Sequence, residues 1–119
     1  MLFRSIRADL PRFHSANVEK NLRLRSALDA IAHRKNATLA QLSIAWPMAQ
    51  GARAGAFIVP ITGAKSRKHL EENVRAVNIV LTPLDFAEIE RIVPPGAASG
   101  TRYPIGQMHR LNKIGRAHV

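Results

Sequence analysis

The chain has 119 residues, of which 46% are hydrophobic, a length and composition that fit one compact domain, or part of one, rather than a disordered tail. Cysteine is absent, which excludes disulfides, thiolate nucleophiles and sulfur-ligated metal sites. The 18 Lys and Arg against eight Asp and Glu give a formal charge of +10, which favours nucleic acid, anionic membrane or phosphorylated ligands without choosing among them.

The N-terminal part of the chain predicts a loop followed by a long helix. The first 16 residues contain Pro11 and no steady hydrophobic period, which is typical of an irregular loop. Asn17 is a good N-cap, and the helix that begins there is expected to end near Asn36. Its apolar stripe, at the three-to-four spacing of a helix, consists of Leu24, Ala27, Leu28 and Ile31.

A second helix is predicted between Thr38 and Gly51. Thr38 followed three residues later by Gln41 makes a capping box at its start. Pro47 removes a backbone donor inside the pattern, which predicts a kink or an earlier end. The apolar face of this helix, on which a core role is expected for the tryptophan, consists of Leu39, Leu42, Ala45, Trp46 and Ala49.

Residues 57–61, FIVPI, form a short apolar run that predicts one strand buried on both faces of a parallel sheet. Pro60 weakens this interpretation, because proline cannot donate a hydrogen bond to a central ladder. A turn at Thr62 and Gly63 follows, and Ser66 is the expected N-cap of the next helix. The sequence therefore predicts a strand, a tight turn and a helix in succession.

The last predicted helix has the best local start signal in the chain. Thr82 is its expected N-cap, Pro83 occupies the first helical position, and Asp85 lies near the positive helix end. Its inward face is expected to carry Phe86, Ile89 and Val93. The Pro-Pro-Gly sequence at residues 94–96 then stops the helix, and a loop follows.

The residues with chemical potential lie in the segment FIVPITGAKSRKHLEEN, residues 57–73. It places a glycine, a hydroxyl and the cations Lys65, Arg67 and Lys68 where a strand turns into a helix, and free backbone amides at a helix start suit an anion. The spacing of these residues alone also fits a plain connection between a strand and a helix, with its lysines facing water. Such connections are the commoner case.

The order of these residues resembles the C-terminal NADP(H) signature of aldo-keto reductases, and further matches flank it. LPRF at residues 10–13, the Asn17 to Asn21 stretch, TLAQLSIAW from Thr38, the LTP start at residues 81–83 and the RYP of residues 102–104 with Met108 are similar to other family segments. The resemblance covers almost all of residues 3–113. It implies the C-terminal part of a (β/α)8 TIM barrel, an α/β fold, here a mostly helical fragment with one buried strand.

The resemblance implies a cofactor role for part of the chain. By position, the residues expected to bind the adenosine 2'-phosphate end of NADP(H) are Gly63, Ala64, Lys65, Ser66, His69, Glu72 and Asn73. Three positions depart from the family pattern: Thr62 stands where Pro is usual, Ala64 where a hydroxyl is usual, and His69 where Arg, Gln or Tyr is common. The missing hydroxyl at Ala64 removes one expected phosphate contact.

The resemblance also implies what the chain lacks. The family reduces aldehydes and ketones by hydride transfer, with a Tyr proton donor assisted by Lys, Asp and His in the first part of the barrel, and none of those motifs is present. Tyr103, the one tyrosine, follows the RYP pattern instead of a catalytic setting. A barrel needs roughly 250 residues, so a longer native protein or a partial reading is expected, with residues 1–113 the barrel part and residues 114–119 a non-native tail. The chain alone is expected to be inactive.

The sequence leaves two other functions open. The charge and a faint likeness of TLAQLSIAW to the start of a helix-turn-helix suggest a small basic DNA-binding protein, although an apolar strand rather than a recognition helix follows. A structural fragment without any ligand is the third reading. Because no apolar run approaches the roughly 20 residues of a membrane span, we expect a cytoplasmic protein that does not bind a membrane. The resemblance implies a small carbonyl substrate as the partner of the full-length protein, and no nucleic acid.

Overall fold

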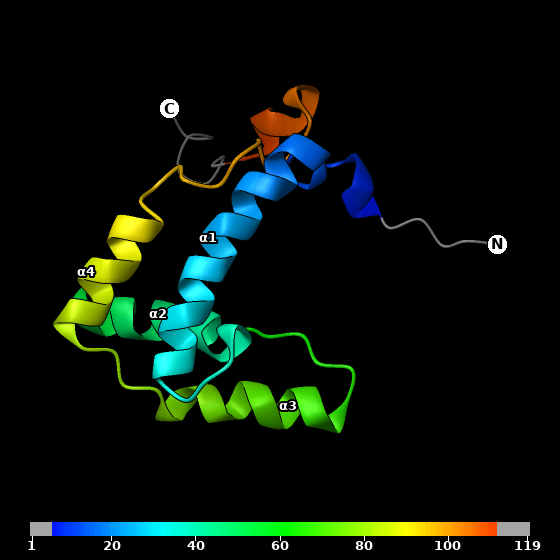
Figure 1. The fold of residues 1–119 in the computed structure, drawn as a ribbon. Coiled ribbons are helices and arrows are strands. Elements are labelled where there is room, and N and C mark those ends of the chain that lie inside the picture. Colours follow the sequence, from blue (N-terminus) through cyan, green and yellow to red (C-terminus); the bar gives the residue numbers. More distant parts are fainter. Residues whose placement is uncertain (1–5, 112–119) are drawn as a thin grey trace. The chain divides into compact units, whose positions relative to one another are not determined.

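The computed structural model describes residues 6–111. Four α-helices, α1 (Ser15–Arg34), α2 (Leu39–Arg53), α3 (Arg67–Val74) and α4 (Pro83–Ile92), carry the fold (Figure 1). Short 3-10 helices occupy Ile6–Asp9, Pro11–Phe13, Arg75–Asn78 and Ile105–Arg110. The chain divides into unit 1, Met1–Leu24 with Pro95–Val119, and unit 2, Arg25–Pro94.

The core of unit 2 is a small cluster contributed by α1, α2 and α4. Ile31 and Ala32 are fully buried, and Leu42 and Ile89 are nearly so. Partly buried side chains packed against this cluster are Leu28, Leu39, Trp46, Leu81 and Ile92. The predicted core role of Trp46 is therefore confirmed, although its indole Nε1 is buried without a hydrogen-bond partner.

The predicted helix starts are confirmed at three places. Thr38 and Gln41 form the reciprocal capping box of α2, Ser66 caps α3, and Thr82 caps α4 in a second capping box with Asp85. In each case the side-chain oxygen of the cap accepts the third backbone N–H of the helix, a bond between residues three apart. Such bonds depend only on local sequence, which explains why they were predictable.

The boundaries of α1 and α2 differ from the prediction in ways that have physical causes. Helix α1 begins at Ser15, so Asn17 lies inside the helix and is not its N-cap, and two 3-10 turns precede it in place of the expected irregular loop. Helix α2 continues through Pro47 to Arg53, so Gly51 does not end it. Gly51 is buried, and a Cβ there would meet Ile58 Cγ1 at 2.7 Å, so the glycine permits a close contact with the following segment.

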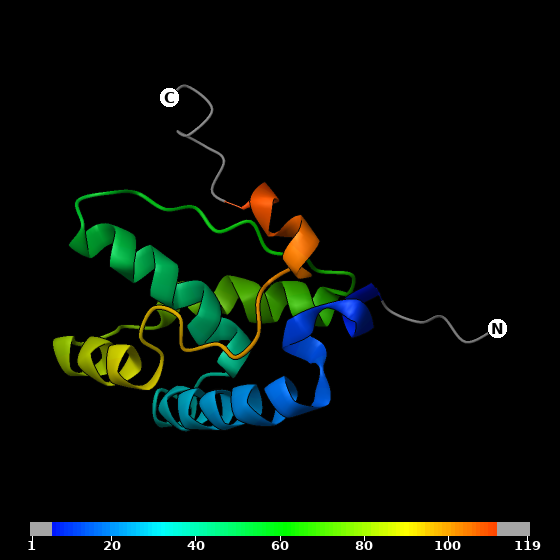
Figure 2. The same ribbon diagram turned by 90° about the horizontal axis from the view of Figure 1, so that it is seen from above.

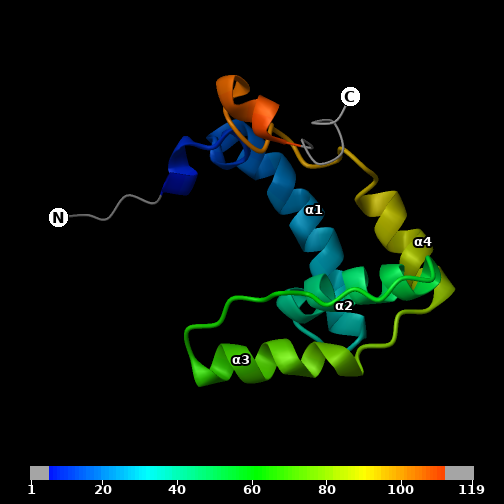
Figure 3. The same cartoon turned by 180° about the vertical axis from the view of Figure 1, so that it is seen from behind.

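The predicted buried strand at residues 57–61 was wrong. No strand occurs within residues 6–111, and residues 56–66 run as a single extended ribbon from the end of α2 to the start of α3 (Figure 3). Phe57, Val59 and Ile61 are 94%, 68% and 100% exposed. A strand requires hydrogen bonds with a neighbouring strand, and the described residues offer none.

Candidate functional site

The turn before α3 presents its polar groups to solvent. Every residue from Ile61 to Glu71 is exposed, and Ser66 adopts the extended backbone of an N-cap, with φ −135° and ψ 155°. The Ser66 Oγ accepts a hydrogen bond from the His69 backbone N–H at 3.2 Å. The first backbone N–H groups of a helix have no carbonyl partner within the helix, so the start of α3 offers donors that suit an anion.

Three cations surround this helix start. Lys65, Arg67 and Lys68 are exposed, and the first turn of α3 contains no acidic residue. Within the described part of the chain, none of the three takes part in a salt bridge. Their charges therefore add to the positive end of the helix dipole, and the nearest acidic residues along the helix, Glu71 and Glu72, lie one turn further on. This arrangement favours a dianionic group such as a phosphate.

Two of the predicted residues are connected directly across the turn. The Asn73 Nδ2 donates a hydrogen bond to the Gly63 carbonyl oxygen at 3.4 Å, ten residues earlier in the chain. This bond ties the beginning of the turn to the second turn of α3. The side chain of Asn73 is half-buried, while Gly63, Ala64, Lys65 and His69 are exposed around it.

Glu72 has a different setting from the other predicted residues. Its Oε1 accepts a hydrogen bond from the Thr38 hydroxyl at 2.7 Å, and its backbone oxygen accepts one from Gln41 Nε2 at 2.9 Å. Figure 2 shows α3 beside the first turns of α2, where these bonds form. Glu72 thus fastens α3 to the capping box of α2, a contact between residues 31 and 34 positions apart that the sequence pattern did not indicate.

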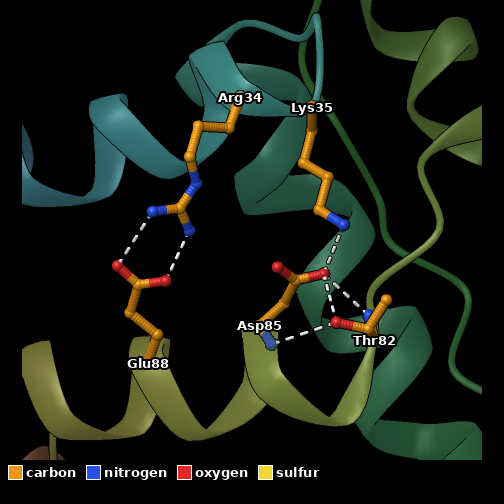
Figure 4. A network of polar contacts seen from close by, with 5 residues as sticks. All are labelled: Arg34, Lys35, Thr82, Asp85 and Glu88. Carbon is orange, nitrogen blue, oxygen red and sulfur yellow. Dashed lines mark hydrogen bonds and ion pairs between the residues drawn. The ribbon is translucent and has the colours of Figure 1, made fainter.

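Charged groups at the end of α1 and directly after it form a separate network with α4 (Figure 4). Arg34 pairs with Glu88, and Lys35 pairs with Asp85, which also accepts the Thr82 backbone N–H at 2.8 Å and hydroxyl at 2.9 Å. Burial acts to raise the pKa of the Asp85 carboxyl, but the bonds from Lys35 and Thr82 together hold it below its ordinary value. The hydrogen bond from Arg34 likewise lowers the pKa of Glu88.

We expect Asp85→Asn to lower the free energy of unfolding at pH 7 by about 1 to 2 kcal/mol, because it removes the ion pair with Lys35 and replaces the charge-assisted bonds from Thr82 with weaker neutral ones. A carboxyl whose pKa is lowered by folding adds stability above its unfolded pKa of about 3.9 and loses it as the pH falls through the folded pKa. The wild type should therefore lose more stability than the variant between pH 7 and pH 3. Urea denaturation followed by circular dichroism at several pH values measures this, with the exposed Asp29→Asn as the control. Parallel pH profiles for wild type and Asp85→Asn would contradict it.

Three further observations concern Tyr103, metal binding and membrane insertion. Tyr103 is half-buried, with the Arg102 guanidinium 5.7 Å from its ring centroid. No group of His, Asp and Glu in residues 6–111 is arranged to hold a metal ion. In the same residues no helix is both long and apolar enough to cross a membrane. The proposed tail at residues 114–119 lies outside the described residues.

Comparison with known proteins assigns the chain to a family. The model of the aldo/keto reductase family matches residues 4–94. The chain is 36% identical over 99 residues to a probable aldo-keto reductase 1 of Glycine max, covering 83% of this chain and 28% of that protein. It is 39% identical over 100 residues to the NADP(+) aldo-keto reductase yakc of Schizosaccharomyces pombe, covering 84% of this chain and 28% of that protein. No solved structure gives a significant match.

The chain therefore belongs to the aldo/keto reductase family, a family of oxidoreductases whose fold is a TIM barrel. It spans 28% of the length of each of these curated relatives. In a TIM barrel each strand pairs with strands from other parts of the sequence, and the described residues, which contain no strand, match only this share of the relatives' length.

Proposed function

We propose that this chain is the part of an NADP(H)-dependent carbonyl reductase that binds the adenosine 2'-phosphate of the cofactor. The observation that carries the proposal is the unneutralised cluster of Lys65, Arg67 and Lys68 at the capped start of α3. A 2'-phosphate is a compact dianion on an otherwise neutral ribose, and charge-assisted hydrogen bonds from lysine suit it. The NADP(+) in the name of the yeast relative supports the same cofactor.

Each residue of the turn has a distinct part in this proposal. Lys65 supplies the principal charge to the 2'-phosphate, and the Ser66 hydroxyl, whose oxygen caps α3, retains a proton to donate to the same group. Gly63 and Ala64 let the cofactor approach the backbone closely, because neither has a long side chain. His69 and Asn73 lie on the first two turns of α3, near the expected place of the adenine.

Glu72 plays an indirect part. Its bonds to Thr38 and Gln41 keep α3, and with it the turn, fixed against α2. The reaction itself, transfer of hydride from the bound nicotinamide to the carbonyl carbon of an aldehyde or ketone, belongs to the whole protein. No residue of this chain is assigned a role in proton transfer, and the small carbonyl substrate contacts other parts of that protein.

Titration of the purified chain with NADPH, NADH and duplex DNA at two salt concentrations tests the proposal. NADPH is expected to bind more tightly than NADH, since the two differ only in the 2'-phosphate. Stronger DNA binding with a steep salt dependence would instead favour a nucleic-acid-binding protein. Equal affinity for NADPH and NADH would remove the support for a 2'-phosphate site, and no binding at all would favour a fragment without a ligand.

A further inference from the structure

Ser99 in unit 1 is held by two asparagine side chains of α1. The Asn21 Oδ1 accepts the Ser99 backbone N–H at 2.6 Å, and its Nδ2 donates to the Ser99 carbonyl oxygen at 3.0 Å. One side-chain amide therefore satisfies both backbone groups of Ser99, as a neighbouring strand would. One helical turn earlier, Asn17 Oδ1 accepts the Ser99 hydroxyl at 2.8 Å, and Asn17 Nδ2 donates to the Pro11 carbonyl oxygen at 2.8 Å.

Gly100 completes this arrangement. Its φ of +84° lies in the region that favours glycine, and a Cβ there would meet Asn17 Nδ2 at 2.7 Å and the Pro11 carbonyl at 3.0 Å. Arg12 Nε donates to the Gly100 carbonyl oxygen at 3.4 Å. We call Asn17, Asn21, Ser99 and Gly100 the asparagine latch. It joins segments 78 and 82 residues apart in the chain.

Among the described residues of the segment that the latch holds, no hydrophobic side chain is buried. The buried hydrophobic residues among those described all lie between Ile31 and Ile89, within unit 2. Asn17, Asn21, Ser99 and Gly100 are half-buried, and the neighbouring Ala98, Thr101 and Arg102 are exposed. A segment fixed by a few half-buried hydrogen bonds opens locally at a lower free-energy cost than a hydrophobic core.

We propose that Asn17 and Asn21 are positioning residues that hold the segment around Ser99 against the first turns of α1. We further propose that this latch opens and closes as a unit separate from the core of unit 2. The proposal is independent of the cofactor site, because the latch residues and the turn at residues 63–73 belong to different units.

Amide hydrogen exchange of the whole chain, measured by NMR, tests the latch. The Ser99 amide should be protected in the wild type, because it donates to Asn21. Asn21→Ala should raise its exchange rate by about tenfold to a hundredfold, the effect of losing one or two net hydrogen bonds. Gly100→Ala is a second variant that keeps both asparagines but forces Asn17 away, and it should raise the same rate.

The amides of α2 and α4 provide the internal reference. Their exchange should stay unchanged in both variants, and Lys20→Ala, an exposed change on the same helix, should leave Ser99 protected. An unprotected Ser99 amide in the wild type would overturn the proposal, as would unchanged protection in both variants. Faster exchange throughout α2 and α4 would also overturn it, because the latch would then not open separately.

Discussion

Replacing Ile31 with alanine is expected to lower the free energy of unfolding of unit 2 by about 3 kcal/mol. Ile31 is fully buried and lies at the centre of the cluster shared with Leu42 and Ile89. Truncation removes apolar contact and leaves a cavity, which typically costs about 2 to 5 kcal/mol for this change. In a core of so few buried side chains, a loss of this size is a large fraction of the total stability.

Urea denaturation followed by the fluorescence of Trp46 measures this effect, since Trp46 is the one tryptophan and packs against the same cluster. Leu84→Ala is the matched control: it also truncates an apolar side chain, but Leu84 is 81% exposed, so it should cost about 0.5 kcal/mol or less. Equal destabilisation by the two substitutions would show that the cluster around Ile31 does not dominate the stability of the chain.

Lys65→Glu is expected to weaken NADPH binding by about tenfold to a hundredfold while changing NADH binding little. The substitution removes a charge-assisted hydrogen bond, worth about 1.5 to 3 kcal/mol, and places a carboxylate where the 2'-phosphate would lie. NADH has no phosphate at that position, so it avoids the direct repulsion. Titration of both cofactors, followed by calorimetry or nicotinamide fluorescence, separates the two effects.

Lys20→Glu controls for net charge, because it makes the same charge change at an exposed position of α1 outside the turn. Its effect on NADPH should be small at moderate ionic strength, where screening weakens the interactions of exposed charges that do not contact the ligand. If Lys20→Glu weakened NADPH binding as much as Lys65→Glu, the attraction would come from the overall charge of +10 rather than from the turn.

Local features of the fold were predictable from sequence because they depend on residues three or four positions apart. The caps at Thr38, Ser66 and Thr82 follow from hydroxyl side chains placed before helical periods, and all three were confirmed. The inward placement of Phe86 and Ile89 on α4 follows from helical spacing and was confirmed as well.

Features that depend on distant residues were not predictable in the same way. The apolar run at residues 57–61 indicated a buried strand, but pattern cannot supply the neighbouring strands that would bury it. The sequence likewise predicted a helix end at Gly51. The structure shows instead that the glycine leaves room for a close contact with Ile58, a residue outside the helix. Composition around Ser99 predicted only a loop, because the bonds to Asn17 and Asn21 join segments far apart in sequence.

The same distinction between local and long-range contacts applies to the candidate site. Clustering of Lys65, Arg67 and Lys68 at a capped helix start is a local property, and the structure brings them together there. The hydrogen bond between Asn73 and Gly63 joins residues ten positions apart, within the segment that the sequence had already singled out. The attachment of Glu72 to Thr38 joins two helices, so only the structure revealed it.

The 2'-phosphate can be tested in isolation from the rest of the cofactor. Adenosine 2',5'-bisphosphate and adenosine 5'-monophosphate differ only by that phosphate, and their affinities for the wild type and for Lys65→Glu form a complete cycle. If the start of α3 binds the 2'-phosphate, the bisphosphate should bind the wild type at least about tenfold more tightly than the monophosphate does. Lys65→Glu should remove most of this preference. Equal affinities of the wild type for the two nucleotides would contradict a 2'-phosphate site at the start of α3.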